Sequence, residues 1–183
     1  NWIYEEHRSG LRMGYLVKQK LFEGQSDFQK VSVYDTKSHG RMLFNDDLAM
    51  VSERDEFIYH DMIAHPALFL HPNPKRVLVI GGGDGGTARE VMRHKNVKVC
   101  VMVEIDQMVI DACIAHIPQT AVAFSNPKMD LRVEDGVVFA KEYREKVSNG
   151  TLEPFDVILV DSTDPIGPAQ PLFDIPFYED LFH

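Results

Sequence analysis

Residues 77–86 read Val-Leu-Val-Ile-Gly-Gly-Gly-Asp-Gly-Gly, and this stretch decides the fold. Its first four residues are a continuous apolar run, which is typical of a strand buried on both faces of a parallel sheet. Gly81, Gly83 and Gly86 then give the spacing G-x-G-x-x-G, and apolar residues at helical spacing follow. A glycine loop between a buried strand and a helix indicates nucleoside binding, although the motif alone is weak evidence.

Beyond the glycine loop, strands and helices alternate along the chain. Apolar runs predict strands over residues 97–103, 131–133 and 155–160. Helical spacing predicts a helix over residues 107–117 and another that ends near residue 147. This alternation predicts an α/β fold with a doubly wound, Rossmann-like parallel sheet.

The first third of the chain reads instead as antiparallel β-structure. Side chains alternate over residues 28–34, and two apolar runs, 42–44 and 48–51, flank the turn-forming Asn45-Asp46-Asp47. A further strand is expected around residues 15–17. We therefore predict a small N-terminal antiparallel β-domain.

The change of structure is marked by Ser52-Glu53-Arg54-Asp55, where the spacing of Ser52 and Asp55 suggests a capping box at the start of a helix. The predicted domains are residues 1–54 and residues 55–183. The helix is expected to bury an apolar face made of Ile58, Met62, Ile63 and Leu68.

Composition places the chain among ordinary globular proteins, with 44% hydrophobic and 26% charged residues. The net charge of −9 argues against nucleic acid as a partner; it suits a cationic substrate, but equally serves simple solubility. No apolar run approaches the ~20 residues that cross a bilayer, and the N-terminus resembles no signal peptide. Cys100 and Cys113 lack metal-ligand spacing and are expected to be buried thiols, which fits a cytoplasmic protein.

The ends of the chain also carry information. It has no initiator methionine and stops at His183 within a predicted helix. We therefore expect a piece of a longer protein, whose α/β domain is incomplete and truncated at its C-terminus.

Acidic residues follow all four predicted parallel strands. Ligands of such sheets bind at the carboxyl ends of the strands, so acids at every end favour a functional crevice over ordinary turns. The acids, in strand order, are Asp84, then Glu104 and Asp106, then Glu134 and Asp135, and finally Asp161 and Asp164.

Two of these acids bear on the ligand. Glu104 ends the second strand about twenty residues after the loop, where an acid accepts hydrogen bonds from both ribose hydroxyls; the alternative is that it caps the next helix. Asp84 lies inside the loop and would repel a pyrophosphate, which disfavours NAD or FAD and favours a ligand with an ammonium or sulfonium group. Alternatively, Asp84 caps the following helix and faces water.

Asp161-Ser162-Thr163-Asp164-Pro165 leads from the last strand into a loop bounded by proline and glycine. Two neighbouring carboxylates raise the pKa of one of them unless a cation lies between them. This pattern indicates a site that handles amines.

Together these motifs resemble the polyamine aminopropyltransferases, which include the spermidine synthases. The resemblance runs in order from Phe28-Gln29 through residues 52–60 and the glycine loop. It continues through Val103-Glu104-Ile105-Asp106 and Glu134-Asp135-Gly136 to residues 161–168. It implies a methyltransferase-type Rossmann-like fold, decarboxylated S-adenosylmethionine as co-substrate, putrescine as acceptor, and spermidine and methylthioadenosine as products. No prosthetic group or metal is implied, and relatives are commonly homodimers or homotetramers.

The resemblance also implies roles for individual residues. Glu104 would hold the ribose, and Asp135 the adenine amino group. Asp84 and Asp161 would grip the ammonium of the donor, and Asp161, assisted by Tyr59, would act on the attacking amine. His60 and Asp164 would line the acceptor path. The remaining donor contacts implied are Gln29, Gly82, Ile105 and Gly136.

Without the resemblance, Tyr59 and His60 would read as surface or packing residues. The nearest alternative function is an S-adenosylmethionine methyltransferase, whose cofactor carries a carboxylate that Asp84 and Asp161 should repel. The glycine loop and its acids would also be compatible with a non-enzymatic polyamine or nucleoside binder, and less so with a nicotinamide oxidoreductase.

Overall fold

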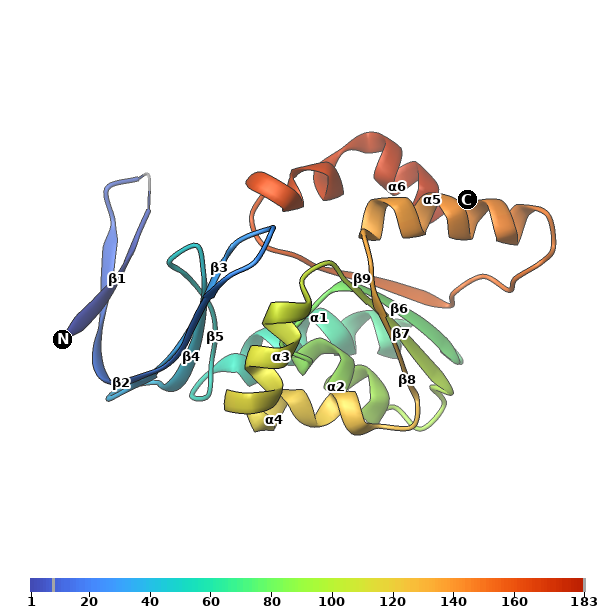
Figure 1. Cartoon of the computed structure of the whole chain (residues 1–183). Helices are drawn as coiled ribbons and strands as arrows, with labels where there is room; N and C mark the ends of the chain where they lie inside the picture. Colours follow the sequence, from blue (N-terminus) through green and yellow to red (C-terminus); the bar gives the residue numbers. More distant parts are fainter. Residues whose placement is uncertain (8, 183) are drawn as a thin grey trace.

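The computed structural model describes residues 1–7 and 9–182, which form two sheets with helices packed around them. The N-terminal sheet is antiparallel with its strands in chain order. β2 is long enough to pair with β1 through its first part and with β3 through its second, and the β1–β2 hairpin projects from the rest of the molecule (Figure 1). The strands are β1 (Trp2–Glu6), β2 (Arg12–Gln25), β3 (Lys30–Thr36), β4 (Gly40–Asn45) and β5 (Leu48–Ser52).

The second sheet is parallel and has the order β8-β7-β6-β9, which confirms the predicted Rossmann-like core. Of the strands in this sheet, β6 comes first along the chain. It has β7 on one side and β9 on the other, so the crevice of such a sheet opens beside the loop after β6. The strands are β6 (Arg76–Gly81), β7 (Val99–Glu104), β8 (Met129–Val133) and β9 (Val157–Asp161). The helices are α1 (Glu56–Leu70), α2 (Gly86–Arg93), α3 (Gln107–His116), α4 (Pro118–Ala121), α5 (Gly136–Ser148) and α6 (Ile175–Phe182), with 3-10 turns η1 (Val122–Ser125) and η2 (Gly167–Phe173).

Both faces of the parallel sheet are covered by helices (Figure 1). Val77 and Val79 pack with residues of α1 and α2, while Leu78 and Ile80 pack with residues of α5 and α6. All four are at most 2% exposed, as predicted for a strand buried on both sides. Because burying one such side chain contributes about 1.5–3 kcal/mol, β6 anchors the glycine loop firmly.

Helix α3 joins the two sheets into one molecule. Its Val109 and Cys113 pack with Val31 and Val33 of the N-terminal sheet. Cys113 and Cys100 are free and buried, which confirms the expectation for both thiols.

The predicted apolar face of α1 is wrong in part. Leu68 is buried, but Ile58 and Met62 are 58% and 68% exposed. The inward face is formed at intervals of four residues by Glu56, His60, Ala64 and Leu68. Polar residues take this face because charged partners from α2 and the glycine loop satisfy them there.

The predicted capping box does not form either. Ser52 is the last residue of β5, where it pairs with Met42, so its backbone is committed to the sheet. Asp55 is the N-cap and makes no side-chain cap bond. Instead, the Ser52 hydroxyl donates to Oδ1 of Asp55 at 2.6 Å.

The predicted hairpin between β4 and β5 is confirmed, and its turn is unusual in composition. Asp46 and Asp47 both have left-handed backbones, with φ of 49° and 65°. Glycine or asparagine is the common choice in such a turn. Asp46 compensates in part, because its Oδ1 accepts a hydrogen bond from the Lys30 N–H at 2.8 Å.

In the part of the chain that the structure describes, no single helix has the length and apolar character needed to cross a membrane, and one bent pair, Gln107–His116 with Pro118–Ser125, meets the length and composition criteria.

Candidate active site

The glycine loop lies against the end of β9. Gly81 has φ of 82°, and a Cβ there would lie 2.0 Å from the backbone oxygen of Asp161, so a side chain does not fit. The N–H of Gly82 donates to this same oxygen at 2.9 Å. The loop that follows β6 therefore places Asp84 near the carboxyl end of β9.

Asp161 is held by two hydroxyl groups from different helices. Tyr59 of α1 donates to Oδ1 at 2.7 Å, and Thr87 of α2 donates to Oδ2 at 2.6 Å. Burial and the charge of Asp84 raise the pKa of Asp161, while the two hydroxyls and His60 oppose that rise. Burial and the neighbouring carboxylate also raise the pKa of Tyr59 far above its usual range, so Tyr59 remains a hydrogen-bond donor at neutral pH.

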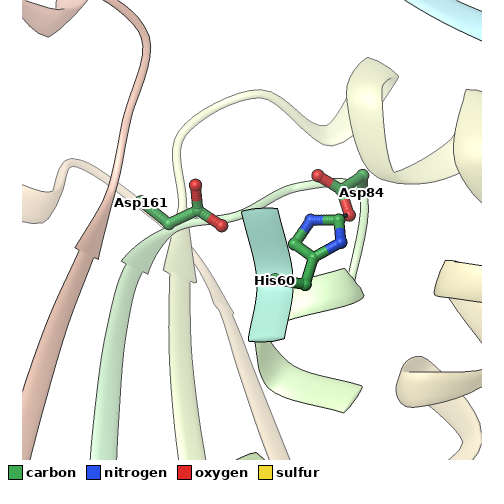
Figure 2. Close-up of side chains that lie close together, drawn as sticks. All are labelled: His60, Asp84 and Asp161. Carbon is green, nitrogen blue, oxygen red and sulfur yellow. Dashed lines mark ion pairs between the residues drawn. The ribbon is translucent and has the colours of Figure 1, made fainter. Parts of the chain in front are cut away.

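His60 lies between two carboxylates and is 2% exposed. Its Nδ1 is 2.5 Å from Oε2 of Glu56, and its Nε2 is 3.3 Å from Oδ1 of Asp84. Burial alone would lower its pKa, but the hydrogen bonds to Asp84 and Glu56 and the charges of Asp84 and Asp161 prevail and raise the pKa to about 9. Figure 2 shows the imidazole beside Asp84, with Asp161 across the site. His60 therefore brings a positive charge into a group of acids.

Asp84 bonds the start of α2, although Gly85 is the N-cap residue, and it also faces the site. Its Oδ1 accepts the N–H of Gly86 at 2.6 Å, so it does bond the first residue of α2. Its side chain is only 14% exposed, however, and faces His60 rather than water. Together, His60, Asp84 and Asp161 offer oxygen and nitrogen atoms within 4.8 Å of one another.

Glu104 ends β7 and is 8% exposed. Burial raises its pKa to about 7, although backbone N–H groups of Asp106, Ile105 and Gly83 oppose the rise. The alternative that Glu104 caps the next helix is wrong, because Oδ1 of Asp106 accepts the N–H of Met108 at 3.0 Å and caps α3. The Glu104 carboxylate lies beside the glycine loop, where a Cβ on Gly83 would be 2.8 Å from its Oε2.

Comparison with known proteins shows to which family the chain belongs. Residues 56–183 match the family model described as the spermine/spermidine synthase domain. The chain belongs to this family. Residues 1–53 match a second model, described as the spermidine synthase tetramerisation domain.

Curated members of the family align over nearly the whole chain. A polyamine aminopropyltransferase of Alkaliphilus metalliredigens is 47% identical over 181 residues, which are 99% of this chain and 61% of that protein. A polyamine aminopropyltransferase of Methanocaldococcus jannaschii is 42% identical over 181 residues, 99% of this chain and 59% of that protein. The chain thus spans about three fifths of the length of these relatives.

Solved structures of family members superpose closely. A spermidine synthase in complex with the transition state analogue AdoDATO has a TM-score of 0.93 and 35% identity, and the match covers 100% of this chain and 60% of that one. The spermidine synthase of Thermotoga maritima has a TM-score of 0.90 and 35% identity, and the match covers 100% of this chain and 59% of that one.

The other residues that the sequence predicts for the site lie further out. Gln29 donates through Nε2 to Oδ2 of Asp106 at 3.0 Å, so it joins the N-terminal sheet to the end of β7. Asp135 is exposed after β8, where its Oδ1 caps α5 by accepting the Val137 N–H at 2.8 Å. Asp164 is exposed in the loop that follows β9.

Close packing explains the glycine at position 136, since a Cβ there would lie 2.7 Å from Cγ2 of Ile80. Half-buried Ile105 follows Glu104 directly. The structure therefore gathers Tyr59, His60, Asp84 and Asp161 at β6 and β9. Glu104 lies one strand away, and Asp135 lies at the sheet edge beyond it.

Three further residues of the candidate site were not predicted from the sequence. Thr87 bonds Asp161 directly, Glu56 bonds His60, and Arg89 holds Glu56 through two nitrogens at 2.8 and 2.9 Å. Glu56 lies four residues before His60, a spacing at which helical side chains meet, so the sequence does indicate that these two residues can pair. Thr87 lies in the first turn of the helix after the loop, and this position also places it close to the predicted site.

A second cluster, formed by Asp61, His65 and Glu90, lies between α1 and α2. Nε2 of His65 is 3.4 Å from Asp61 and 3.2 Å from Glu90. Burial would raise the pKa of Glu90, but ion pairs with Arg89 and Arg93 lower it. The charge of Glu90 is thus already balanced, and the cluster serves to tie the two helices together.

Proposed function

We propose that the whole protein is a spermidine synthase, which transfers the aminopropyl group of decarboxylated S-adenosylmethionine to putrescine and releases spermidine and methylthioadenosine. The observation that carries the proposal is the Asp161 carboxylate, held by the Tyr59 hydroxyl at 2.7 Å beside Asp84 and the glycine loop. Membership of the spermine/spermidine synthase family supports it.

The donor is proposed to lie along the carboxyl ends of the parallel strands. Glu104 would bind the ribose hydroxyls, and Asp135 the adenine amino group. Asp84 and Asp161 would bind the ammonium of the aminopropyl group. The remaining donor contacts proposed are Gln29, Gly82, Ile105 and Gly136.

The acceptor amine must lose a proton before it attacks the carbon next to the sulfonium. With a lysine-like pKa, freeing the nitrogen at pH 7 costs about 4–5 kcal/mol. A carboxylate with a raised pKa accepts that proton more readily, and the pKa of Asp161 is raised. We assign Asp161 as the base and Tyr59 as its hydrogen-bonding partner, while His60 and Asp164 would line the acceptor path.

The bonds balance without help from a further group. The amine nitrogen forms a bond to the aminopropyl carbon, the carbon–sulfur bond breaks, and its electron pair converts sulfonium to a neutral thioether. The proton passes to Asp161. The remaining task is to place two cations in line, which oriented carboxylates accomplish.

Charge separates this proposal from methyl transfer. Glu56, Asp84 and Asp161 supply three carboxylates when ionised, against the two positive charges of Arg89 and His60. The excess negative charge favours a decarboxylated donor over S-adenosylmethionine, whose carboxylate would approach Asp84 and Asp161.

We also propose that the whole protein is a homo-oligomer, a homotetramer or a homodimer, with a domain boundary near residue 54. The match of residues 1–53 to the tetramerisation domain supports an assembly through the N-terminal sheet. Its projecting hairpin exposes Trp2 by 55% and Leu11 by 54%. Light scattering during gel filtration would give the mass of the whole protein, and a monomer at micromolar concentration would contradict the proposal.

The deciding experiment incubates the whole protein with putrescine and each donor, and separates the nucleoside products by chromatography. Methylthioadenosine from the decarboxylated donor is expected. S-adenosylhomocysteine from S-adenosylmethionine, with no methylthioadenosine from the decarboxylated form, would sink the proposal. Asp161→Asn should abolish turnover and leave donor binding measurable, and near-normal turnover would remove Asp161 as the base.

A further inference from the structure

We propose that Thr87 is a positioning residue of the transfer reaction, whose hydroxyl fixes one oxygen of Asp161 while Tyr59 fixes the other. The inference rests on the proposed function, because Asp161 is the base assigned there. Its geometric basis is the 2.6 Å bond from Thr87 Oγ1 to Asp161 Oδ2 and the 2.7 Å bond from Tyr59 to Oδ1.

Thr87 is well placed to act on Asp161 alone. It is 0% exposed in the first turn of α2, directly after the glycine loop. A threonine hydroxyl in a helix commonly bonds a carbonyl of the preceding turn. Here it donates instead to a carboxylate at the end of β9, 74 positions along the chain.

The surroundings of Oδ2 make this hydroxyl important. A Cβ on Gly82 would lie 3.0 Å from Oδ2 and 3.3 Å from Cγ1 of Val79, so this oxygen lies against the loop backbone near an apolar side chain. A buried carboxylate oxygen without a donor costs free energy. Loss of the Thr87 hydroxyl therefore favours the protonated carboxyl, which cannot accept a proton from the amine.

The two hydroxyls also set the plane of the carboxylate. Tyr59 reaches Asp161 from α1 and Thr87 reaches it from α2, so rotation about the Cβ–Cγ bond would break both bonds. One lone pair on each oxygen remains available, because each oxygen accepts one hydroxyl in this pair and a carboxylate oxygen has about two acceptor positions. Thr87 thereby leaves Asp161 able to receive the amine proton.

The charged groups around Asp161 do not replace the hydrogen bond from Thr87. The charge of Asp84 raises the pKa of Asp161, while the charge of His60, which lies against Asp84, lowers it. The hydrogen bond from Thr87 lowers the pKa directly, as does that from Tyr59. Thr87 and Tyr59 contribute neither a charge nor a titration of their own near neutral pH, and Thr87 is the one of the two that bonds Oδ2.

The test compares Thr87→Val, which keeps the shape and removes the hydroxyl, with Thr87→Ser, which keeps the hydroxyl. In the whole protein, Thr87→Val is expected to move the acid limb of the kcat profile upward by about one pH unit, or roughly tenfold in rate below the limb. The plateau at high pH should be retained, and Thr87→Ser should restore the wild-type limb. Thr87→Ala serves as a second hydroxyl-free variant if Thr87→Val does not fold.

A second readout is independent of catalysis. Carboxyl ¹³C chemical shifts of Asp161 in the 183-residue chain, followed against pH, should show the same upward shift in Thr87→Val and not in Thr87→Ser. An unshifted Asp161 titration, or a kcat that falls equally at every pH, would overturn the proposal. If the wild-type protein transfers no aminopropyl group, the proposed function fails, and the titration still reports whether Thr87 controls Asp161.

Discussion

The hydroxyl oxygen of Tyr59 lies 2.7 Å from Oδ1 of Asp161, although 102 positions separate the two residues in the chain. One belongs to the helix that enters the α/β domain and the other ends its last parallel strand. Because the pKa of Tyr59 is raised, the phenol donates this bond throughout the neutral range. The bond is the basis of the first prediction.

Tyr59→Phe is expected to lower the kcat of the whole protein by about 10–100-fold, because it removes the hydroxyl that donates a hydrogen bond to the proposed base. The pocket proposed for the nucleoside co-substrate stays intact. The KM for the nucleoside donor should stay close to that of the wild type. Steady-state kinetics with decarboxylated S-adenosylmethionine measure both. Tyr4→Phe, on the exposed strand β1, is the matched control and should leave kcat unchanged; equal losses in the two variants would count against the assignment.

Glu104 predicts a pH-dependent affinity for the nucleoside. Its pKa of about 7 in the free protein means that protonation competes with ribose binding below neutrality. The affinity of this chain for methylthioadenosine should therefore fall toward tenfold per pH unit well below pH 7, as measured by titration calorimetry. Glu104→Gln should bind weakly with little pH dependence in this range, whereas Glu134→Gln, at an exposed acid after the next strand, should behave as wild type. A pH-independent wild-type affinity would contradict ribose binding by this carboxylate.

His60 predicts a loss of stability at alkaline pH. Its pKa rises from 6.5 to about 9 on folding, so the folded chain keeps a proton that the unfolded chain releases. The resulting stabilisation is complete below pH 6.5 and disappears as the pH rises through 9, with a change in unfolding free energy of roughly 3 kcal/mol. Urea unfolding of this chain at pH 6.5 and 9.5 should show the drop, which His60→Gln should reduce and His71→Gln should preserve. Parallel pH profiles for wild type and His60→Gln would refute the assignment.

The hairpin turn predicts a stabilising substitution. Asp47 has a left-handed backbone, and its exposed ion pair with Lys30 at 3.0 Å offsets little of the strain. Asp47→Gly is expected to raise the unfolding free energy by about 0.5 kcal/mol. Asp46→Gly is the control, because it also relieves strain but loses the bond from the Lys30 N–H. Thermal unfolding should place Asp47→Gly above wild type and Asp46→Gly below Asp47→Gly, and the reverse order would show that the side chains matter more than the backbone.

Local pattern was enough to predict much of this molecule. The strand at residues 77–80, the glycine loop and the hairpin around Asp46-Asp47 each depend on neighbours in sequence. The acids at the strand ends follow from the same logic, because parallel strands bring their carboxyl ends to one edge.

Features that depend on distant partners could not be predicted in the same way. Ile58 and Met62 look like core residues of α1, yet they are exposed. Glu56 and His60 are buried in their place, because Arg89 pairs with Glu56 and Asp84 pairs with His60. Both partners lie far away in the sequence, so the local pattern does not reveal them. Thr87 escaped notice because its partner, Asp161, comes from the last strand.

The strand order β8-β7-β6-β9 also has a consequence for how the chain emerges from the ribosome. The glycine loop, Glu104 and Asp135 are all synthesised before β9, so a nascent chain acquires these proposed donor contacts before it acquires Asp161. Until β9 arrives, one edge of β6 has no strand beside it, and its backbone groups are open to pairing with other chains. Pairing of β9 with β6 covers that edge of β6 and brings the proposed base to the site in the same step.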